Sequence, residues 1–325
     1  MGSCLDKPRE NETNAEIRSI VPFTATSSIE KRHTISLNSE PSLNNHNDNY
    51  SHNKRQKKNS WIFSINADNR FAKLHALFKY TWQVNFLAPV HEQLESGNAR
   101  VLDYGCQTGE WVLDISVKYP LAKVWGIDTS NIFPSSPIPL NSNFLHFDIL
   151  NGFPFADNTF DLVHARCLAF TFTKIEWEHR VIKELLRVLK PGTGWLSLLE
   201  INLFYTNEGP NTAKLTESMR SFLKGKNMDP DITSLQLNLL HESNQCTDIQ
   251  VHERFPTPGN YIDFVRVEDI IAKEFALTMY GLRTELSNFM GLNNEEYNSL
   301  IESSVKEFKI YKTSVRQTNI IARRI

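Results

Sequence analysis

The stretch VLDYGCQTGEW at 101–111, followed by an amphipathic run and then VWGID at 124–128, decides the fold. An apolar strand ending in an acid, a glycine-rich turn, a helix and a second strand ending in an acid form half of a nucleotide-type binding site. Gly105 and Gly109 let the backbone turn sharply and let a ligand approach the amides. We therefore expect an α/β fold with a cofactor site at this turn.

Two acids flank the turn. Asp103 opens it, and Asp128 ends the next strand, where an acid accepts hydrogen bonds from ribose hydroxyls. A nicotinamide-dependent dehydrogenase requires G-x-G-x-x-G, whereas this turn reads G-C-Q-T-G, so its spacing argues against that class. A tight strand-to-helix turn without a ligand is the alternative.

The turn resembles motif I of the class I S-adenosylmethionine (SAM) methyltransferases, [DE]-x-G-x-G-x-G. The resemblance implies that Asp103 helps hold the amino-acid portion of SAM and that Asp128 holds its ribose. The other turn residues implied to bind SAM are Gly105, Cys106, Gln107 and Gly109. Gln107 stands where the motif has its middle glycine. If that position requires a positive φ, its side chain costs about 1–2 kcal/mol, or about tenfold in affinity.

The segment 143–170 reads as a short strand ending near Asp148, a loop, and an apolar strand at about 160–166. It resembles the third and fourth strands of the same family. The resemblance implies that Asp148 and Ile149 flank the adenine ring. Thr129 and Arg166, at neighbouring strand tips, complete the predicted cofactor-binding set. A solvated turn residue is the alternative for Asp148.

The residues after Arg166 predict a helix and a further strand. Thr173 and Glu176 form a potential capping box, and Lys190-Pro191-Gly192 ends the helix. The strand at 195–201 matches the family's fifth strand, which lies beside the methyl end of the cofactor. Glu200 near its tip is therefore a candidate substrate contact and general base. A buried acid held by backbone amides is the alternative.

The segment 69–90 resembles the helical segment before motif I in fungal methyltransferases of the group that includes velvet-associated regulators of secondary metabolism. The matching residues are Arg70, His75, Phe78, Trp82 and Ala88-Pro89, while Leu74 replaces a glutamine. His75 is the second candidate base, and a packed helix histidine is its alternative role. The segment 204–217 also resembles this group.

The resemblance implies a Rossmann-like class I methyltransferase fold: a mostly parallel seven-stranded sheet with an antiparallel last strand, helices on both faces and a helical substrate cap. We expect the domain to span 61–325, with cap elements at about 206–245 and 260–311. Periodicity predicts helices at 212–223, 232–242, 261–288 and 295–311, and strands at 247–255 and within 314–323.

Composition sets further limits. A net charge of −2 gives no overall field for nucleic acid or an anionic membrane, and no apolar run approaches a membrane span. Four cysteines without C-x-x-C spacing argue against a disulfide framework and against zinc. We expect a soluble, intracellular, cytoplasmic protein.

Residues 1–60 are polar and predict a disordered arm that can dock a protein partner. Its basic cluster, Lys54 to Lys58, is either a nuclear address or a solvated charge run. The start MGSCLD resembles an N-myristoylation site, although Asp6 stands where Ser or Thr is required.

The function implied is SN2 transfer of the SAM methyl group to an acceptor, which we expect to be a small molecule because aromatic residues lie near the cap and no basic stripe is evident. No metal is required. The alternative is an inactive methyltransferase-like regulatory or binding module, which Gln107 favours.

Overall fold

The computed structural model describes residues 67–135 and 137–325. The predicted arm 1–60, with its basic cluster and the MGSCLD start, and residues 61–66 of the predicted domain lie outside the described residues.

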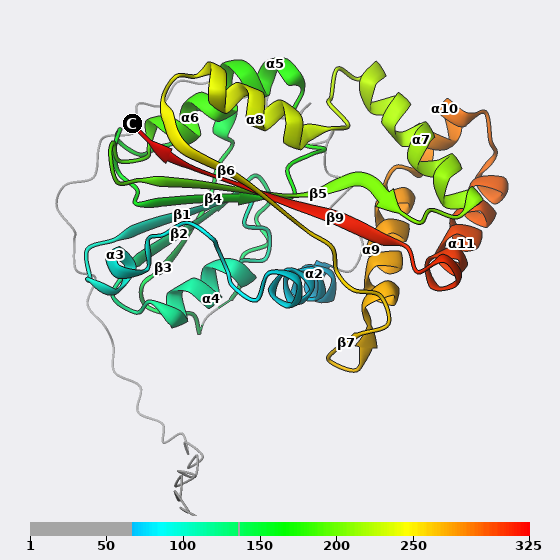
Figure 1. The fold of residues 1–325 in the computed structure, drawn as a ribbon, viewed down its shortest axis with the longest axis horizontal. Helices are drawn as coiled ribbons and strands as arrows, with labels where there is room; N and C mark the ends of the chain where they lie inside the picture. Colours follow the sequence, from blue (N-terminus) through cyan, green and yellow to red (C-terminus); the bar gives the residue numbers. More distant parts are fainter. Residues whose placement is uncertain (1–66, 136) are drawn as a thin grey trace, which may run out of the picture. The chain divides into compact units, whose positions relative to one another are not determined.

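A seven-stranded sheet forms the centre of the described chain (Figure 1). Its strands are β1 (Arg100–Tyr104), β2 (Lys123–Asp128), β3 (Ser142–His146), β4 (Leu162–Arg166), β5 (Trp195–Thr206), β6 (Cys246–Arg254) and β9 (Ser314–Arg324). Their order is β3-β2-β1-β4-β5-β9-β6, and β9 runs antiparallel to both of its neighbours. The predicted mostly parallel sheet with an antiparallel last strand is confirmed.

Helices cover both faces of the sheet (Figure 1). On one side lie α3 (His91–Glu95) and α4 (Glu110–Lys118), and on the other lie α5 (Lys174–Glu176), α6 (Ile182–Arg187) and α8 (Ile232–Glu242). A third apolar cluster lies beside the carboxyl end of β5. It joins α2 (Ala67–Trp82), α7 (Pro210–Gly225), α9 (Val267–Gly281), α10 (Arg283–Met290) and α11 (Asn294–Tyr311). Thus α8, within the first predicted cap range, packs on the sheet instead.

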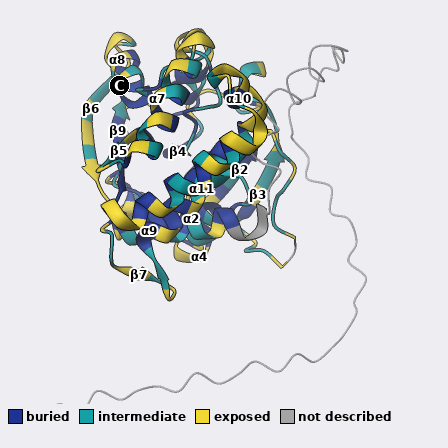
Figure 2. Cartoon of the chain, turned by 90° about the vertical axis from the view of Figure 1, so that its right-hand side faces the viewer, coloured by how far each residue is buried: buried dark blue, intermediate teal, exposed yellow. Residues whose placement is uncertain are grey.

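Strands β1, β2 and β4 are largely buried on both faces, whereas the edge strand β3 is partly exposed. In β1, Val101 faces the α4 cluster and Leu102 the α8 cluster, and both are fully buried. Parallel strands covered on both faces have nearly continuous apolar sequences, which is why the sequence of 101–128 predicts two buried strands. In contrast, α2, α9 and α11 carry both buried and exposed residues (Figure 2).

The predicted single helix at 261–288 is wrong. The structure has a short hairpin of β7 (Tyr261–Ile262) and β8 (Val265–Arg266), then α9 and α10. Asp263 and Phe264 adopt φ values of 46° and 64°, so the backbone reverses in a left-handed turn that no helix can contain. Figure 2 shows the hairpin projecting beyond α9.

Two other segments differ in detail from their predicted form. The capping box between Thr173 and Glu176 is confirmed, but a π turn at Trp177–Val181 separates α5 from α6. Strand β5 continues to Thr206, past the predicted end at 201, because β9 pairs with it along this extension through an irregularity after Ile201. A short 3-10 turn, η2 (Ile149–Asn151), follows β3.

Candidate functional site

The glycine turn between β1 and α4 lies at the carboxyl edge of the sheet. Gly105 and Gly109 adopt φ values of 74° and 84°, and the Gly105 amide donates to the carbonyl of Ile127 at 2.8 Å. A Cβ at Gly109 would lie 2.6 Å from Cε1 of Phe144. A Cβ at Gly105 would lie 2.8 Å from Cδ2 of Leu168. Both positions therefore require glycine for conformation and for space.

Gln107 is held in the left-handed region, with φ 55°. Its amide donates to Oδ2 of Asp128 at 2.9 Å, which ties the turn to the end of β2. The positive φ that the motif implies is thus present, and a non-glycine residue bears its cost. The neighbouring Cys106 is buried, and burial raises the pKa of its thiol well above the usual value.

Asp128 is buried and its carboxylate is already partly satisfied. Oδ1 accepts from the amide and the hydroxyl of Ser130 at 2.8 and 2.6 Å, and Oδ2 accepts from Gln107. Each carboxylate oxygen retains accepting capacity for a ligand hydroxyl. Thr129 is exposed, and its carbonyl accepts from Nε2 of His146 at 2.8 Å.

Asp103 is the least satisfied polar side chain of the turn. It is 0% exposed, and in the described part of the chain neither carboxyl oxygen has a hydrogen-bond partner. Burial raises the pKa of Asp103 to about 8, the Arg166 guanidinium opposes this rise, and the charges of Asp128 and Glu110 add to it. An unpaired buried carboxyl is costly, and a cationic ligand group is the partner that it lacks. The ammonium group of SAM fits this requirement.

Asp148 and Ile149 lie where η2 begins. Oδ1 of Asp148 accepts from the amide of Leu150 at 3.0 Å and so caps the turn. Ile149 is fully buried in the apolar cluster under α8. Asp148 is half-buried and its Oδ2 makes no hydrogen bond to a described residue, which leaves an acceptor at this position.

A cavity of about 110 Å³ lies between α2, α7, α9 and the ends of β5 and β9. Gln107 from the glycine turn and Glu200 from β5 both line it, so the candidate cofactor turn and the candidate base share one space. Most other lining side chains are apolar: Phe71, Leu74, Leu77, Phe170, Ile201, Leu203, Tyr205, Met219, Ile271, Phe275 and Val315. We refer to this space as the acceptor cavity.

Glu200 is buried and held from one side. Its Oε1 accepts from the amide of Leu168 and from Nε2 of Gln236, both at 3.1 Å. Burial raises the pKa of Glu200 to about 7, opposed by the Leu168 amide, by Gln236 and by the Ala169 amide. Its buried Oε2 makes no hydrogen bond to described residues. Glu200 is therefore held through Oε1, while Oε2 has no partner among the described residues and can accept a proton.

The remaining charges of the acceptor cavity neutralise each other. Nε of Arg70 on α2 lies 2.8 Å from Oε2 of Glu274 on α9, and both side chains are largely buried. Arg70 also reaches the hydroxyl of Thr278 at 3.4 Å. Since this cation is already paired, the cavity presents no free positive charge to an anionic acceptor.

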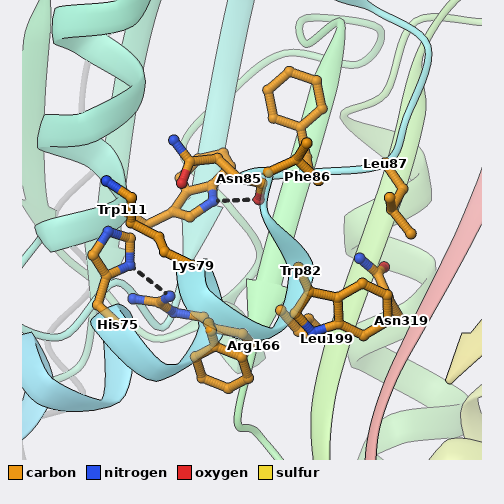
Figure 3. A pocket seen from close by; sticks show the side chains of 12 residues that line it. His75, Lys79, Trp82, Asn85, Phe86, Leu87, Trp111, Arg166, Leu199 and Asn319 are labelled. Carbon is orange, nitrogen blue, oxygen red and sulfur yellow. Dashed lines mark hydrogen bonds between the residues drawn. The ribbon is translucent and has the colours of Figure 1, made fainter. Parts of the chain in front are cut away.

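His75 lies in a second, small pocket between α2, α4 and β4, shown in Figure 3. Its Nδ1 contacts Nη1 of Arg166 at 3.0 Å, and its Nε2 contacts Oδ2 of Asp114 at 3.0 Å. Burial lowers the pKa of His75. With both nitrogens engaged, the histidine has no free lone pair to take a proton from an acceptor, which favours its packed role.

The structure brings six of the twelve predicted site residues together in pairs: Gln107 with Asp128, His75 with Arg166, Asp103 with Arg166 through charge, and Gln107 with Glu200 in one cavity. Sequence reasoning missed Asp114 and Glu274. Both lie on helices at positions that read as ordinary surface acids, so only the fold identifies their partners.

Two aromatic residues of β5 and α9, Tyr205 and Phe275, line the acceptor cavity. Phe264 is fully exposed at the hairpin tip. Within residues 67–135 and 137–325, no helix combines the length and apolar character needed to cross a bilayer, and no group of three His, Cys, Asp or Glu side chains is placed to hold a metal.

Comparison with known proteins identifies the same region. A family described as a methyltransferase domain matches residues 101–192. Methyltransferase str3 of Strobilurus tenacellus is 26% identical over 158 residues, which cover 47% of this chain and 55% of that protein. The secondary metabolism regulator LAE1 of Cochliobolus heterostrophus is 35% identical over 105 residues, 32% of this chain and 33% of that protein. The match thus spans about half of str3 and a third of LAE1.

Among solved structures, a loganic acid methyltransferase with SAH, S-adenosylhomocysteine, aligns at a TM-score of 0.44 and 13% identity, over 86% of this chain and 98% of that chain.

Proposed function

Because this chain belongs to the class I SAM-dependent methyltransferases, we propose that it transfers a methyl group from SAM to a small, mostly apolar acceptor. The observation that carries the proposal is the acceptor cavity, which Gln107 of the cofactor turn and Glu200 of β5 line together. Methyl transfer requires donor and nucleophile to meet in one water-poor space.

We assign the cofactor to the carboxyl edge of β1, β2 and β3. Asp103 would take the ammonium group, Asp128 the ribose hydroxyls, and Asp148 with Ile149 the adenine ring. The backbone of Gly105, Cys106, Gln107 and Gly109 would follow the ligand, with Thr129 and Arg166 at its border. When bound, SAM would supply a methyl group on a sulfonium, and SAH, a neutral thioether, would be the leaving group.

The domain and its cap follow from the same assignment. We propose one methyltransferase domain behind the N-terminal arm, in which α2, α7 and α9 enclose the acceptor, since these helices supply the cavity wall beyond the strands. The apolar lining and the paired Arg70 and Glu274 favour a neutral acceptor over an anionic one.

The part of the chain in the reaction is to orient the acceptor, exclude water and remove a proton where the nucleophile carries one. Glu200 is the base that we propose, because its carboxyl lies at the wall of the acceptor cavity and titrates near neutrality. As the acceptor atom bonds to the methyl carbon, its proton would pass to Glu200.

A methyltransferase-like regulatory module is the second candidate. Gln107 favours it, because a side chain at φ 55° strains the cofactor turn, and similarity to proteins named as regulators keeps it open. The carboxyl and glycine residues of the turn and of the two strand ends favour the enzyme, because all are of the types that a working cofactor site needs. They are Asp103, Gly105, Gly109, Asp128 and Asp148.

The deciding experiment is isothermal titration of the full chain with SAM and with SAH. Binding of both, weakened about tenfold or more by Asp128→Ala, is the expected result, because a buried carboxylate bond to a ligand hydroxyl is lost. A screen of neutral hydroxylated compounds with methyl-labelled SAM then tests transfer. If the folded protein binds neither ligand, the regulatory module takes precedence.

A further inference from the structure

Arg166 and Asp103 are a basic and an acidic side chain, both buried, on the same face of neighbouring strands, since Asp103 of β1 lies opposite His164 of β4 and Arg166 follows two residues later. They do not pair. Arg166, 6% exposed at the end of β4, makes no ion pair with any described carboxylate. Its guanidinium lies instead over the ring of Phe78, 5.3 Å from the centroid, and donates to His75. Its charge still acts on Asp103, since it holds the pKa of that carboxyl below the value that burial alone would give.

Buried opposite charges normally pair, because an unpaired charge in the interior is strongly destabilising. The contacts of Arg166 show where its guanidinium is held instead. A guanidinium can only donate, so Nδ1 of His75 is the acceptor at 3.0 Å and the proton of the neutral ring lies on Nε2. Nε2 then donates to Oδ2 of Asp114 on α4, which also lies 2.7 Å from Nζ of Lys79.

The result is a chain of contacts across three elements: Asp114 of α4, His75 of α2 and Arg166 of β4 (Figure 3 shows the His75–Arg166 bond). The hydrogen bonds to His75 and Lys79 lower the pKa of Asp114 to about 2, so it is a carboxylate at neutral pH. A fixed carboxylate sets the histidine tautomer and ring orientation, and the ring in turn sets the guanidinium.

We infer that His75 is a positioning residue which, anchored by Asp114, holds Arg166 away from Asp103 and so keeps an unpaired carboxyl and an unpaired guanidinium available to the two charges of an α-amino acid. This inference rests on the proposed function. The ligand portion concerned is the amino-acid end of SAM and SAH, with its ammonium toward Asp103 and its carboxylate toward Arg166. Without His75, Arg166 and Asp103 would pair with each other and compete with the ligand.

The test compares two ligands on four proteins by isothermal titration: SAH, which carries the amino-acid end, and 5′-methylthioadenosine, which lacks it. His75→Phe keeps a ring of similar size and removes both hydrogen bonds. Asp114→Asn weakens the hydrogen bond that orients His75 and changes a partly exposed residue. It therefore tests the same role if the His75 variant does not fold. Lys79→Met is the matched control, because it removes the exposed partner of Asp114 and leaves His75 in place.

In His75→Phe, we expect SAH affinity to fall about tenfold or more, as for loss of a positioned charge-assisted contact, while methylthioadenosine affinity stays within about twofold. Asp114→Asn should show the same selective loss, smaller in size, and Lys79→Met should bind as wild type. The melting temperature of ligand-free His75→Phe should stay level or rise, because Arg166 gains Asp103 as a partner.

Two outcomes would overturn the inference. Unchanged SAH affinity in both variants would show that Arg166 needs no positioning. Equal loss of both ligands together with a lower melting temperature would show a merely structural histidine. Wild-type protein that binds neither ligand would instead contradict the proposed function, so the two failures are distinguishable.

Discussion

The cofactor turn and the acceptor cavity lie side by side, but they are built differently. The turn is made from short loops and backbone bonds: Gly105 to Ile127, Gln107 to Asp128, and Gly109 packed against Phe144. The acceptor cavity is made from side chains of five elements spread from Arg70 to Val315. The first is therefore written as a pattern in the sequence, whereas the second exists only after folding.

The largest expected effect concerns the chemistry of the acceptor cavity. Glu200→Gln should lower kcat by about 10²-fold to 10⁴-fold, the range for loss of a general base. Because the pKa of Glu200 is raised to about 7, the base form prevails above that pH, so the wild-type rate should rise with pH through about 7 and then level. Initial rates with labelled SAM from pH 5.5 to 8.5 measure both.

Glu274→Gln is the control for this prediction. It changes the other carboxyl of the acceptor cavity, which Arg70 already neutralises, so the pH step should persist whatever happens to KM. SAH affinity should be unaffected by Glu200→Gln. If Glu200→Gln still shows the rise in rate through about pH 7, Glu200 is not the general base. It is then a structural acid held by the Leu168 amide.

The second effect tests whether the turn depends on close packing. Gly109→Ala places a methyl group 2.6 Å from the Phe144 ring at φ 84°, so unfolding free energy should fall by about 2–4 kcal/mol. Gly291→Ala is the matched control: its φ of 68° is similar but nothing lies within 4 Å of the new Cβ, so about 1 kcal/mol is expected. Urea denaturation separates the two.

Equal losses in the two alanine variants would mean that backbone conformation alone accounts for the glycine. Close packing against Phe144 would then not explain why the turn needs glycine at position 109.

The third effect is a pH dependence of cofactor binding. The pKa of Asp103 is raised to about 8 in the ligand-free protein, so the carboxyl is mostly protonated at pH 6 and must ionise to hold an ammonium group. SAH affinity should therefore rise with pH, by up to about tenfold per unit between pH 6 and 7. The affinity should level off above pH 8, where Asp103 is mostly ionised.

Methylthioadenosine has no ammonium group and should show a nearly flat profile, as should SAH with Asp103→Asn. A flat SAH profile in the wild type would contradict the assignment of Asp103 to the ammonium group.

The sequence predicted the turn and the individual strands because their determinants are local or periodic. The β1 and β2 strands, the positive φ expected at Gln107 and the Thr173–Glu176 capping box rest on residues a few positions apart or on a repeated pattern. The arrangement of the strands in one sheet came from the family resemblance, because strand pairing joins distant residues. Propensity failed at 261–266, where two residues in left-handed conformation form a hairpin inside an apparently helical pattern.

The contacts of His75 and the acceptor cavity could not be predicted, for a different reason. His75 meets Asp114 and Arg166, which are 39 and 91 positions away, and each contact is set by helix placement on the sheet. A histidine on an apolar helix face gives no sign of which charges it will meet. The same holds for Arg70 and Glu274, 204 positions apart.

The smallest effect tests the boundary between the two regions, which Gln107 forms: its backbone amide donates to Asp128, and the same residue lines the acceptor cavity. Gln107→Gly relieves a left-handed conformation that costs about 1–2 kcal/mol, so SAH affinity should be equal or up to about tenfold higher. Acceptor KM should change, because the cavity wall loses a side chain. Asn158→Gly, also at positive φ (59°) but exposed in a loop outside the cavity, is the control and should leave affinity unchanged. If Gln107→Gly instead weakens SAH binding strongly, the glutamine side chain itself contacts the cofactor. Its replacement of the motif glycine would then contribute to binding and would not be only a conformational cost.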